Sequence, residues 1–290
     1  MPILGVFVQG KVYQILAGYY DIKSGDKIYR VRGAGKLRHN NLTPLVGDEV
    51  IFENEFLIKI LERKNEMIRP KVANIDQVII VMSLKEPDFS SFLLDKFLAK
   101  VYHLNSQITI LLTKKDLYDG NNFKVDFYLK NQDTYLISMQ NLEEYKGISN
   151  LFDNKVNVLM GQTGVGKTTF LNLISDNDFL TQKISKSLGR GIHSTRVVRM
   201  IDFLNGQLVD APGFSSFEID FDPLELARTF KFYKNFEYKC KFRTCQHYEE
   251  DEKICSVKQE ISKQNIPLWR YENYVKILLE VRESKNKRNF

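Results

Sequence analysis

The octapeptide GQTGVGKT at residues 161–168 constrains the fold of this chain more than any other feature. It matches the pattern G-x-x-x-x-G-K-[ST], in which glycines let backbone N–H groups converge on phosphate oxygens. The apolar run KVNVLM precedes it and the helix-like run TTFLNLIS follows it, which is the strand–loop–helix context that the motif requires. The sequence therefore predicts a phosphate site in which Lys167 reaches the β- and γ-phosphates and Thr168 binds Mg²⁺.

The residues around this loop alternate between apolar strands and amphipathic helices. Gln77–Ser83 is a continuous apolar, β-branched run, which is typical of a parallel strand buried on both faces. Further strands are expected at 108–112, 134–137 and 156–160, with a helix at 89–102. This βαβ rhythm predicts a mainly parallel sheet.

Two segments point to guanine rather than adenine as the base. Thr113-Lys114-Lys115-Asp116 ends a buried strand and resembles the N-K-x-D element of GTPases, with Thr113 where the common pattern has Asn. The Asp116 carboxylate would accept hydrogen bonds from guanine N1–H and N2–H₂, a donor pair that adenine lacks, while the Lys114 stem covers one face of the base. Ser138-Met139 is the candidate for the S-A element that backs the guanine.

Two more segments match the switch elements of GTPases. Asp210-Ala211-Pro212-Gly213 follows the strand-like run GQLV and resembles D-x-x-G, which holds Mg²⁺ through water and places the Gly213 N–H on the γ-phosphate. A threonine that binds Mg²⁺ and senses the γ-phosphate is expected between this element and the phosphate loop. Thr195 is the candidate, and Ser194 is the alternative.

The order of these elements differs from that of an ordinary GTPase, in which the phosphate loop comes first and the base-reading elements come last. Here the base-reading elements at 113–116 and 138–139 precede the phosphate loop, the switch threonine and D-x-x-G at 161–213. The set is complete but cyclically rearranged, so the sequence predicts a circularly permuted GTPase.

Hydrolysis requires a group that orients the attacking water. Many GTPases place a glutamine just after D-x-x-G, but this chain has Phe214 there. His193, in the switch segment, is the nearest polar candidate, because an imidazole nitrogen can orient or polarise water. A structural or RNA-contacting histidine is the alternative interpretation.

The first 65 or so residues have a different pattern, with short strand-like runs separated by turn formers such as Ser24-Gly25-Asp26. Five strands at this spacing predict a small barrel or sandwich. An OB-type barrel would suit exposed aromatics and basic character, and a generic β-domain with a structural role is the alternative. The expected strands are ILGVFVQ, KVYQILAGYY, DKIYRVR, DEVIFE and FLIKILE, and the expected exposed aromatics are Tyr19, Tyr20 and Tyr29.

All three cysteines lie near the C-terminus, and with one histidine they form a Cys₃His set suited to a tetrahedral, structural Zn²⁺. Charged residues lie between them, which disfavours the alternative of cysteines buried in an apolar core. The proposed zinc ligands are Cys240, Cys245, His247 and Cys255, and the neighbours that could contact RNA are Lys239, Lys241, Phe242 and Arg243. A final amphipathic helix is expected, with one face formed by Leu268, Tyr271, Val275, Leu278 and Arg282.

Composition and charge exclude several classes of protein. With 43% hydrophobic and 27% charged residues, the chain is neither collagen-like nor fully disordered, and three cysteines do not make a disulfide scaffold. The net charge of +6 lies in the flanks: +3 in residues 1–69, −1 in 70–220 and +4 in 221–290. Basic flanks suit a polyanion such as RNA, although a solvated lysine-rich surface is the alternative.

The N-terminal run MPILGVFVQG has no basic leader and no small-residue cleavage site, so no signal peptide is expected. No apolar run approaches the roughly 18–20 residues that cross a bilayer, so no membrane partner is expected. We expect a monomer in a reducing cytoplasm.

Together these motifs resemble the ribosome small subunit-dependent GTPase family, RsgA, also called YjeQ or YloQ. The resemblance covers nearly the whole chain and also includes Arg69-Pro70, residues 73–77, the GRGIHST switch at 189–195 and the C-x₄-C-x-H-x₇-C spacing. It implies a late factor in maturation of the 30S ribosomal subunit and its 16S rRNA, with a GTPase that the subunit stimulates. It further implies that His193 serves in hydrolysis.

The sequence departs from the family in the switch. Ile192 stands where the family often has a basic or polar residue, and Arg196 where it often has a third threonine. The family architecture implies a multidomain α/β protein in three parts. These are an N-terminal OB-type β-barrel at 1–68, a circularly permuted P-loop GTPase domain with a mainly parallel sheet at 69–220, and a C-terminal helical zinc-binding domain at 221–290.

We assign catalysis to His193, Lys167 and Thr195, and Mg²⁺ binding to Thr168 and Thr195. The residues expected to bind GTP or GDP are Thr113, Lys114, Lys115, Asp116, Ser138, Met139, Gly161, Gln162, Thr163, Gly164, Val165, Gly166, Lys167, Thr168, Thr169, Asp210 and Gly213. Two alternatives to a ribosome-activated GTPase stay open. One is an RNA-binding module that uses nucleotide only as a conformational ligand, and the other is an ATP-using P-loop enzyme, which Asp116 disfavours.

Overall fold

The chain folds into two compact units, each assembled from segments that are far apart in the sequence. The computed structural model describes residues 7–35, 43–68, 70–138, 140–141, 144, 147–175, 198–210, 221–233, 235 and 237–288. The first unit comprises Met1–Ile79, Met139–Met160 and Gly166–Ser215, and the second comprises Ile80–Ser138, Gly161–Val165 and Ser216–Phe290.

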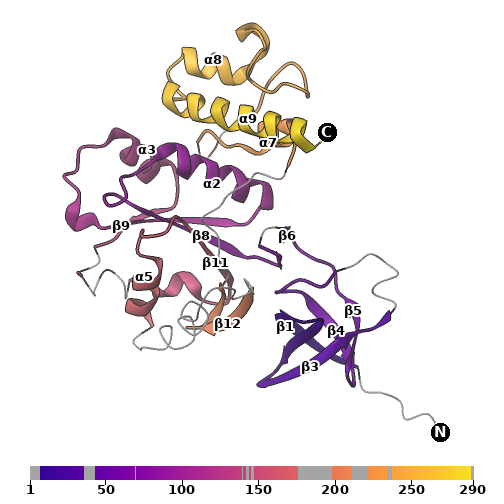
Figure 1. The fold of residues 1–290 in the computed structure, drawn as a ribbon. Helices are drawn as coiled ribbons and strands as arrows, with labels where there is room; N and C mark the ends of the chain where they lie inside the picture. Colours follow the sequence, from indigo (N-terminus) through magenta and orange to yellow (C-terminus); the bar gives the residue numbers. More distant parts are fainter. Residues whose placement is uncertain are drawn as a thin grey trace. The chain divides into compact units, whose positions relative to one another are not determined.

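A closed five-stranded barrel forms the N-terminal part of the first unit (Figure 1). The barrel closes because β4 pairs with both β5 and β1, and its β3–β5 pairing is parallel. Its strands are β1 (Val8–Leu16), β2 (Tyr19–Ser24), β3 (Lys27–Gly33), β4 (Glu49–Glu53) and β5 (Phe56–Ile60). The core consists of Val12, Ile22, Val31, Val50, Phe52 and Leu57. Closure agrees with the predicted OB-type architecture.

The strand boundaries at the start of the barrel differ from the sequence prediction. β1 (Val8–Leu16) joins the end of the run expected at 3–9 to the start of the run expected at 11–20, and a tight turn at Ala17-Gly18 interrupts the second run. Both turn residues have positive φ, 50° and 81°, which is the type I′ geometry that two-residue hairpins favour. Tyr20, expected to be exposed, instead packs against the barrel core.

The barrel is joined to a β-hairpin of the same unit. Within the first unit, β12 (Arg199–Phe203) and β13 (Gly206–Asp210) form a hairpin, and Gln14 of β1 pairs with Arg199. The Tyr13 hydroxyl donates a hydrogen bond of 2.7 Å to Asp202, whose carboxylate also pairs with Lys23. The remaining elements of this unit are β6 (Glu66–Met67), β7 (Val72–Ala73), the 3₁₀ helix η2 (Ser149–Phe152), β11 (Val156–Met160) and α5 (Lys167–Ile174).

The second unit contains most of the other strands that the sequence predicts for the parallel sheet; the strand expected at 156–160 is β11 of the first unit. β8 (Gln77–Ser83) starts in the first unit and is buried along its whole length. The next elements are α2 (Ser91–Leu104), β9 (Gln107–Thr113), η1 (Lys115–Leu117), α3 (Phe123–Asn131) and β10 (Thr134–Leu136). β9 lies between β8 and β10 in the sheet, and β10 pairs with it in parallel. The expected strands and helix are therefore confirmed to within two residues.

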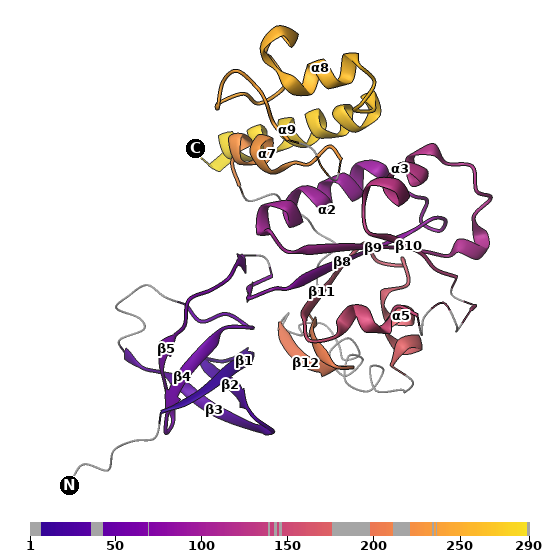
Figure 2. The same ribbon diagram turned by 180° about the vertical axis from the view of Figure 1, so that it is seen from behind.

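The C-terminal segment packs on the α2 side of this unit. Its elements are α7 (Pro223–Thr229), the 3₁₀ helix η3 (Glu252–Ile254), α8 (Ser256–Ser262) and α9 (Leu268–Arg288). Figure 2 shows α7 and α9 beside α2, on the side away from β8 and β9. Asp222 begins α7 with a capping box, in which its carboxylate accepts from the N–H groups of Leu224 and Glu225.

The buried face of α9 is rotated from the predicted one. Leu268 is 59% exposed, so the expected stripe does not start there. The buried residues of the helix are Arg270, Asn273, Tyr274, Ile277, Leu278 and Val281. Arg270 and Asn273 are polar, and a hydrophobicity pattern assigns such residues to the solvent side.

A buried ion pair explains this rotation. Asp95 of α2 and Arg270 of α9 are both fully buried, with Nη2 and Oδ1 3.3 Å apart. Asp95 also accepts hydrogen bonds of 2.8 Å from the Tyr128 hydroxyl and from Asn273 Nδ2. The Arg270 guanidinium carbon lies 5.1 and 5.2 Å from the ring centres of Phe127 and Tyr128. Burial raises the pKa of Asp95, and Arg270 and the hydrogen bonds oppose that rise.

No helix among the described residues is long and apolar enough to cross a membrane. The 21-residue helix α9 has sufficient length, but charged side chains occur throughout its sequence.

Replacing Asp95 by Asn should lower the free energy of unfolding by about 3–5 kcal/mol, because Arg270 would stay buried without its counter-charge. Urea unfolding measures this effect. Trp269 is the only tryptophan and packs on Tyr128 with ring centres 5.9 Å apart, so its fluorescence reports on this interface.

The matched control is Lys96→Gln, which breaks a partly exposed ion pair with Glu280 between the same two helices. Its effect should stay below about 1 kcal/mol. Equal losses in the two variants would contradict a special contribution of the buried pair.

Candidate functional site: a nucleotide site and a metal cluster

The predicted phosphate loop joins β11 to α5 and has the required backbone geometry. The backbone φ is 147° at Gly161, 84° at Gly164 and 91° at Gly166, a region that residues with side chains rarely adopt. A Cβ on Gly161 would lie only 2.2 Å from the Val81 carbonyl oxygen, so a side chain is excluded there. α5 begins at Lys167, directly after the loop, and its first N–H groups have no intrahelical acceptor. The strand–loop–helix context is therefore confirmed.

The side chains of this segment differ in exposure. Val165 is fully buried, whereas Thr163, Thr168 and Thr169 are exposed. Gln162 is half-buried. Burial lowers the pKa of Lys167 to about 8. A bound triphosphate would raise that pKa again, because its negative charge stabilises the ammonium.

The predicted base-reading element lies at the carboxyl ends of β9 and β10. Lys114 has a φ of 59° and turns the chain from β9 into η1, and its ammonium donates to the Glu86 carbonyl. The Asp116 carboxylate is exposed and accepts a 3.1 Å hydrogen bond from the Ser138 hydroxyl. The Lys115 N–H donates to the Ile137 carbonyl at 3.2 Å. The structure thus brings the predicted 113–116 element and Ser138 together.

Thr113 connects this element to the phosphate loop. Its hydroxyl lies 2.7 Å from the Val165 carbonyl oxygen and 3.2 Å from that of Met82. A hydroxyl has one proton, and the shorter contact assigns it to Val165. Thr113 is fully buried, so this hydrogen bond is shielded from water. Threonine therefore makes a tether to the phosphate loop from the position where the common GTPase pattern has asparagine.

D-x-x-G starts at the end of a neighbouring strand. β13 pairs in parallel with β11, with Val209 opposite Val158, so Asp210 ends its strand beside the strand that leads into the phosphate loop. The side chain of Asp210 lies outside the described part of the chain. The same holds for the predicted site residues Met139, His193, Ser194, Thr195 and Gly213.

The four predicted metal ligands form a compact cluster. Their ligand atoms all lie within 4.8 Å of one another, and His247 Nδ1 lies 3.4, 3.3 and 3.5 Å from the sulfurs of Cys240, Cys245 and Cys255. A tetrahedral zinc ion with ordinary bond lengths requires sulfur–nitrogen separations of about 3.5 Å. The cluster is therefore a potential zinc-binding site, and a bound ion would cross-link this loop. Contrary to the sequence expectation, Cys245 and Cys255 are also buried in a hydrophobic core, because apolar residues of α7, α8 and α9 pack around them.

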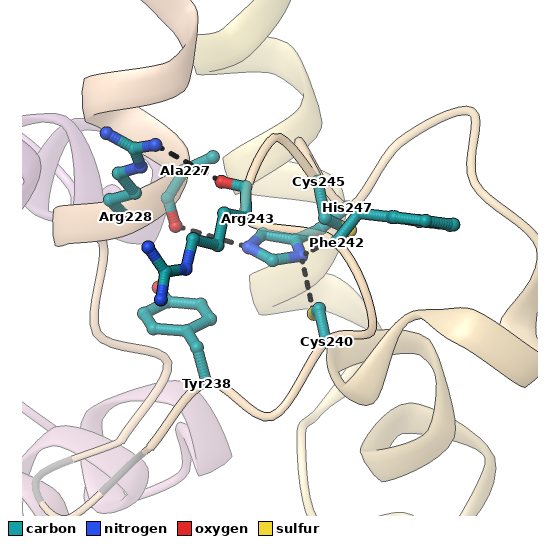
Figure 3. A pocket seen from close by; sticks show the side chains of 8 residues that line it. All are labelled: Ala227, Arg228, Tyr238, Cys240, Phe242, Arg243, Cys245 and His247. Atoms are coloured by element: carbon teal, nitrogen blue, oxygen red, sulfur yellow. Dashed lines mark hydrogen bonds between the residues drawn. The ribbon is translucent and has the colours of Figure 1, made fainter.

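The surroundings of the cluster also fit a metal site. His247 Nε2 donates to the Ala227 carbonyl at 3.2 Å, which leaves the Nδ1 lone pair directed at the three sulfurs. Figure 3 shows the contacts of this ring with Ala227 and Cys240. Burial lowers the pKa of His247 to about 4, so the imidazole is neutral at pH 7. Burial also raises the pKa of the Cys245 and Cys255 thiols, so metal binding would release their protons.

Sequence reasoning missed the groups that support the ligands. Tyr238 stacks on the His247 ring with centres 5.0 Å apart, and the Ser256 N–H donates to Cys240 Sγ at 3.3 Å. The Ala227 carbonyl is a backbone group, and no side-chain pattern marks it. These contacts join residues up to 20 positions apart in the sequence, so ligand spacing carries no signal for them.

The fold and the two sites define a class of protein: a circularly permuted P-loop GTPase with a closed N-terminal barrel and a Cys₃His cluster near the C-terminus. A family model described as RsgA GTPase matches residues 60–220, and one described as RsgA N-terminal domain matches residues 9–56. The chain belongs to the RsgA GTPase family, whose members are GTP-hydrolysing enzymes that use Mg²⁺ with GTP.

Several relatives match the chain along almost its whole length. The small ribosomal subunit biogenesis GTPase RsgA of Mycoplasmopsis pulmonis is 52% identical, covering 94% of this chain and 99% of the relative. RsgA of Halalkalibacterium halodurans is 39% identical over 97% of this chain and 99% of the relative.

Two solved structures share the fold. YjeQ from Thermotoga maritima superposes with a TM-score of 0.79 at 28% identity, covering 95% of this chain and 99% of that one. YloQ, described as a circularly permuted GTPase, superposes with a TM-score of 0.76 at 32% identity, covering 98% of both chains.

Replacing Thr113 by Val should weaken GTP binding about tenfold, because the shape is kept while the Val165 carbonyl loses its buried donor. Thr113→Ser keeps the hydroxyl and should bind GTP nearly as tightly as the parent. Titration calorimetry of both variants measures the effect. Equal affinities of the Ser and Val variants would contradict the tether.

GTP affinity should fall about tenfold between pH 7 and pH 9, because the protonated form of Lys167 binds the phosphates and its pKa is about 8. Lys167→Arg stays charged over this range, so its affinity should lack this decrease. Calorimetric titrations at several pH values, at constant ionic strength, compare the two proteins. Parallel profiles would show that another group, such as guanine itself, titrates.

Proposed function

We propose that this chain binds the small ribosomal subunit and hydrolyses GTP in response to it, late in 30S maturation. The observation that carries the proposal is the 52% identity, over 94% of the chain, to a relative named small ribosomal subunit biogenesis GTPase. The local geometry supports guanine as the base, since the exposed carboxylate of Asp116 is held by Ser138 next to Lys114.

The proposed nucleotide site uses the residues assigned from the sequence. Asp116 reads the guanine, Lys167 contacts the β- and γ-phosphates, and Thr168 binds Mg²⁺ together with Thr195. Asp210 holds Mg²⁺ through a water molecule, and the Gly213 N–H donates to the γ-phosphate. His193 orients the attacking water, as the family resemblance implies.

The proposed partner surface involves 16S rRNA and the two basic flanks. Residues 1–69 carry a net charge of +3 and residues 221–290 carry +4, so both ends of the chain attract the phosphate backbone. We assign these ends to a barrel domain at 1–68 and a zinc-binding domain at 221–290, with the GTPase domain at 69–220 between them. The protein acts as a monomer in the cytoplasm.

GTP turnover with and without purified 30S subunits tests the proposal. We expect the subunit to stimulate turnover strongly in the parent chain. His193→Ala should lower the stimulated rate by roughly 10²-fold, the scale of a lost general acid–base or water-orienting group, while GTP affinity stays nearly unchanged. Equal rates in the two proteins would remove His193 from the mechanism.

Two outcomes would replace the proposal. If 30S subunits bind but turnover stays at its basal rate, the chain is an RNA-binding module that uses nucleotide as a conformational ligand. If ATP competes better than GTP for the site, the guanine assignment of Asp116 is wrong.

A further inference from the structure

A cavity of about 520 Å³ opens beside the metal cluster (Figure 3). The ligands Cys240, Cys245 and His247 form one wall, and the rest is lined by α7 and by the loop between the first two cysteines. Its volume lies in the range of pockets that hold a nucleotide-sized ligand. The cluster itself needs only a single ion, so most of this cavity serves no purpose in metal binding.

Two arginines give the cavity a positive charge. Arg228 from α7 and Arg243 from the cysteine loop both line it, and none of the lining residues is acidic. In Figure 3 both guanidinium groups lie on the Ala227 side of the His247 ring. Arg228 Nη2 donates to the Arg243 carbonyl at 3.3 Å, and neither arginine forms a salt bridge with a described residue. Both side chains are exposed and retain free donors for an anion.

An exposed aromatic side chain, Phe242, also lines this cavity. Phe242 lines it while 50% exposed, and the Lys241 ammonium lies 5.6 Å from its ring centre. Lys239, which is also exposed, precedes the first cysteine. Aromatic rings that alternate with cationic side chains are the usual surface for single-stranded nucleic acids, because bases stack while phosphates pair.

The metal ligands hold these groups in place. Phe242 and Arg243 lie between Cys240 and Cys245, so an ion bound to both cysteines fixes the ends of the short segment that carries them. His247 Nε2 donates to the carbonyl of Ala227, the residue before Arg228, which ties α7 to the same cluster. The positions of both arginines therefore depend on the cluster.

We propose that this cavity holds one nucleotide of a single-stranded RNA segment. Arg228 and Arg243 bind its phosphate, and Phe242 stacks on a base. Guanidinium groups match phosphate oxygens with paired hydrogen bonds. The size of the cavity and the adjacent aromatic favour a nucleotide within a strand over an isolated phosphate ion. The inference rests on the proposed function, because it specifies how the C-terminal segment contacts RNA.

The test uses the zinc-loaded full chain and a fluorescein-labelled U₁₀ RNA, with anisotropy measured at several salt concentrations. The double variant Arg228→Gln/Arg243→Gln should bind U₁₀ roughly 30- to 100-fold more weakly than the parent. Each arginine is expected to contribute about tenfold to the affinity. Its slope of log K against log salt should be smaller by about 0.7, because both arginines bind the same phosphate of the single strand.

The matched control is Lys253→Gln/Lys276→Gln, which removes two exposed positive charges of the same segment outside the cavity. Its affinity should change less than about threefold. Zinc content and thermal unfolding verify that both double variants fold. Removing zinc with a chelator should weaken U₁₀ binding by the parent chain and change little in the arginine variant.

Equal affinities and salt slopes in the arginine variant and the control would overturn the inference. The inference would also be overturned if the arginine variant binds U₁₀ normally but has lost affinity for inorganic phosphate. The cavity would then be a site for free anions. If the arginine variant instead binds U₁₀ normally but no longer binds a poly-glutamate peptide that the parent binds, the cavity serves an acidic protein partner. If U₁₀ binding depends on the arginines but 30S subunits do not stimulate GTP turnover of the parent, the inference stands and the proposed function fails.

Discussion

The hydrogen bond from the Thr113 hydroxyl to the Val165 carbonyl joins the two halves of the nucleotide site. One partner ends β9, just before η1 with the predicted base-reading residue Asp116, and the other lies within the phosphate loop. Both are fully buried, so the loss of this contact would leave a desolvated carbonyl without a donor. In a permuted chain the base-reading element comes before the phosphate loop in the sequence, and this buried contact fixes the distance between them.

The C-terminal segment depends on two different interactions. The buried Asp95–Arg270 pair joins α9 to α2. Neither charge can reach water, so each group needs the other as its partner. The Cys₃His cluster lies in the loop before α8, and its Cys245 and Cys255 are also buried in the hydrophobic core of this segment. His247 links the cluster to α7 through Ala227, so the metal ligands also set the position of the cationic cavity.

The sequence predicted the β8, β9 and β11 strands closely, because apolar runs bounded by turn formers leave little ambiguity. It also identified the four residues that form the potential metal-binding cluster. It failed at the Ala17-Gly18 turn, where alanine is an uncommon residue at positive φ, and at the buried face of α9. The sequence pattern assigns Arg270 to the surface, because arginine is rarely buried without a partner. Only the structure shows the buried Asp95 carboxylate of α2 that pairs with it.

The sequence by itself determined the family, the order of the nucleotide-binding elements and the ligand set of the metal cluster, because each depends on residue types at fixed spacing. Only the tertiary structure decided that threonine can replace asparagine as the tether to the phosphate loop, and that Arg228 and Arg243 share one cavity. These facts depend on residues 52 and 15 positions apart. Contacts over such distances are set by how strands and helices pack, which no local pattern records.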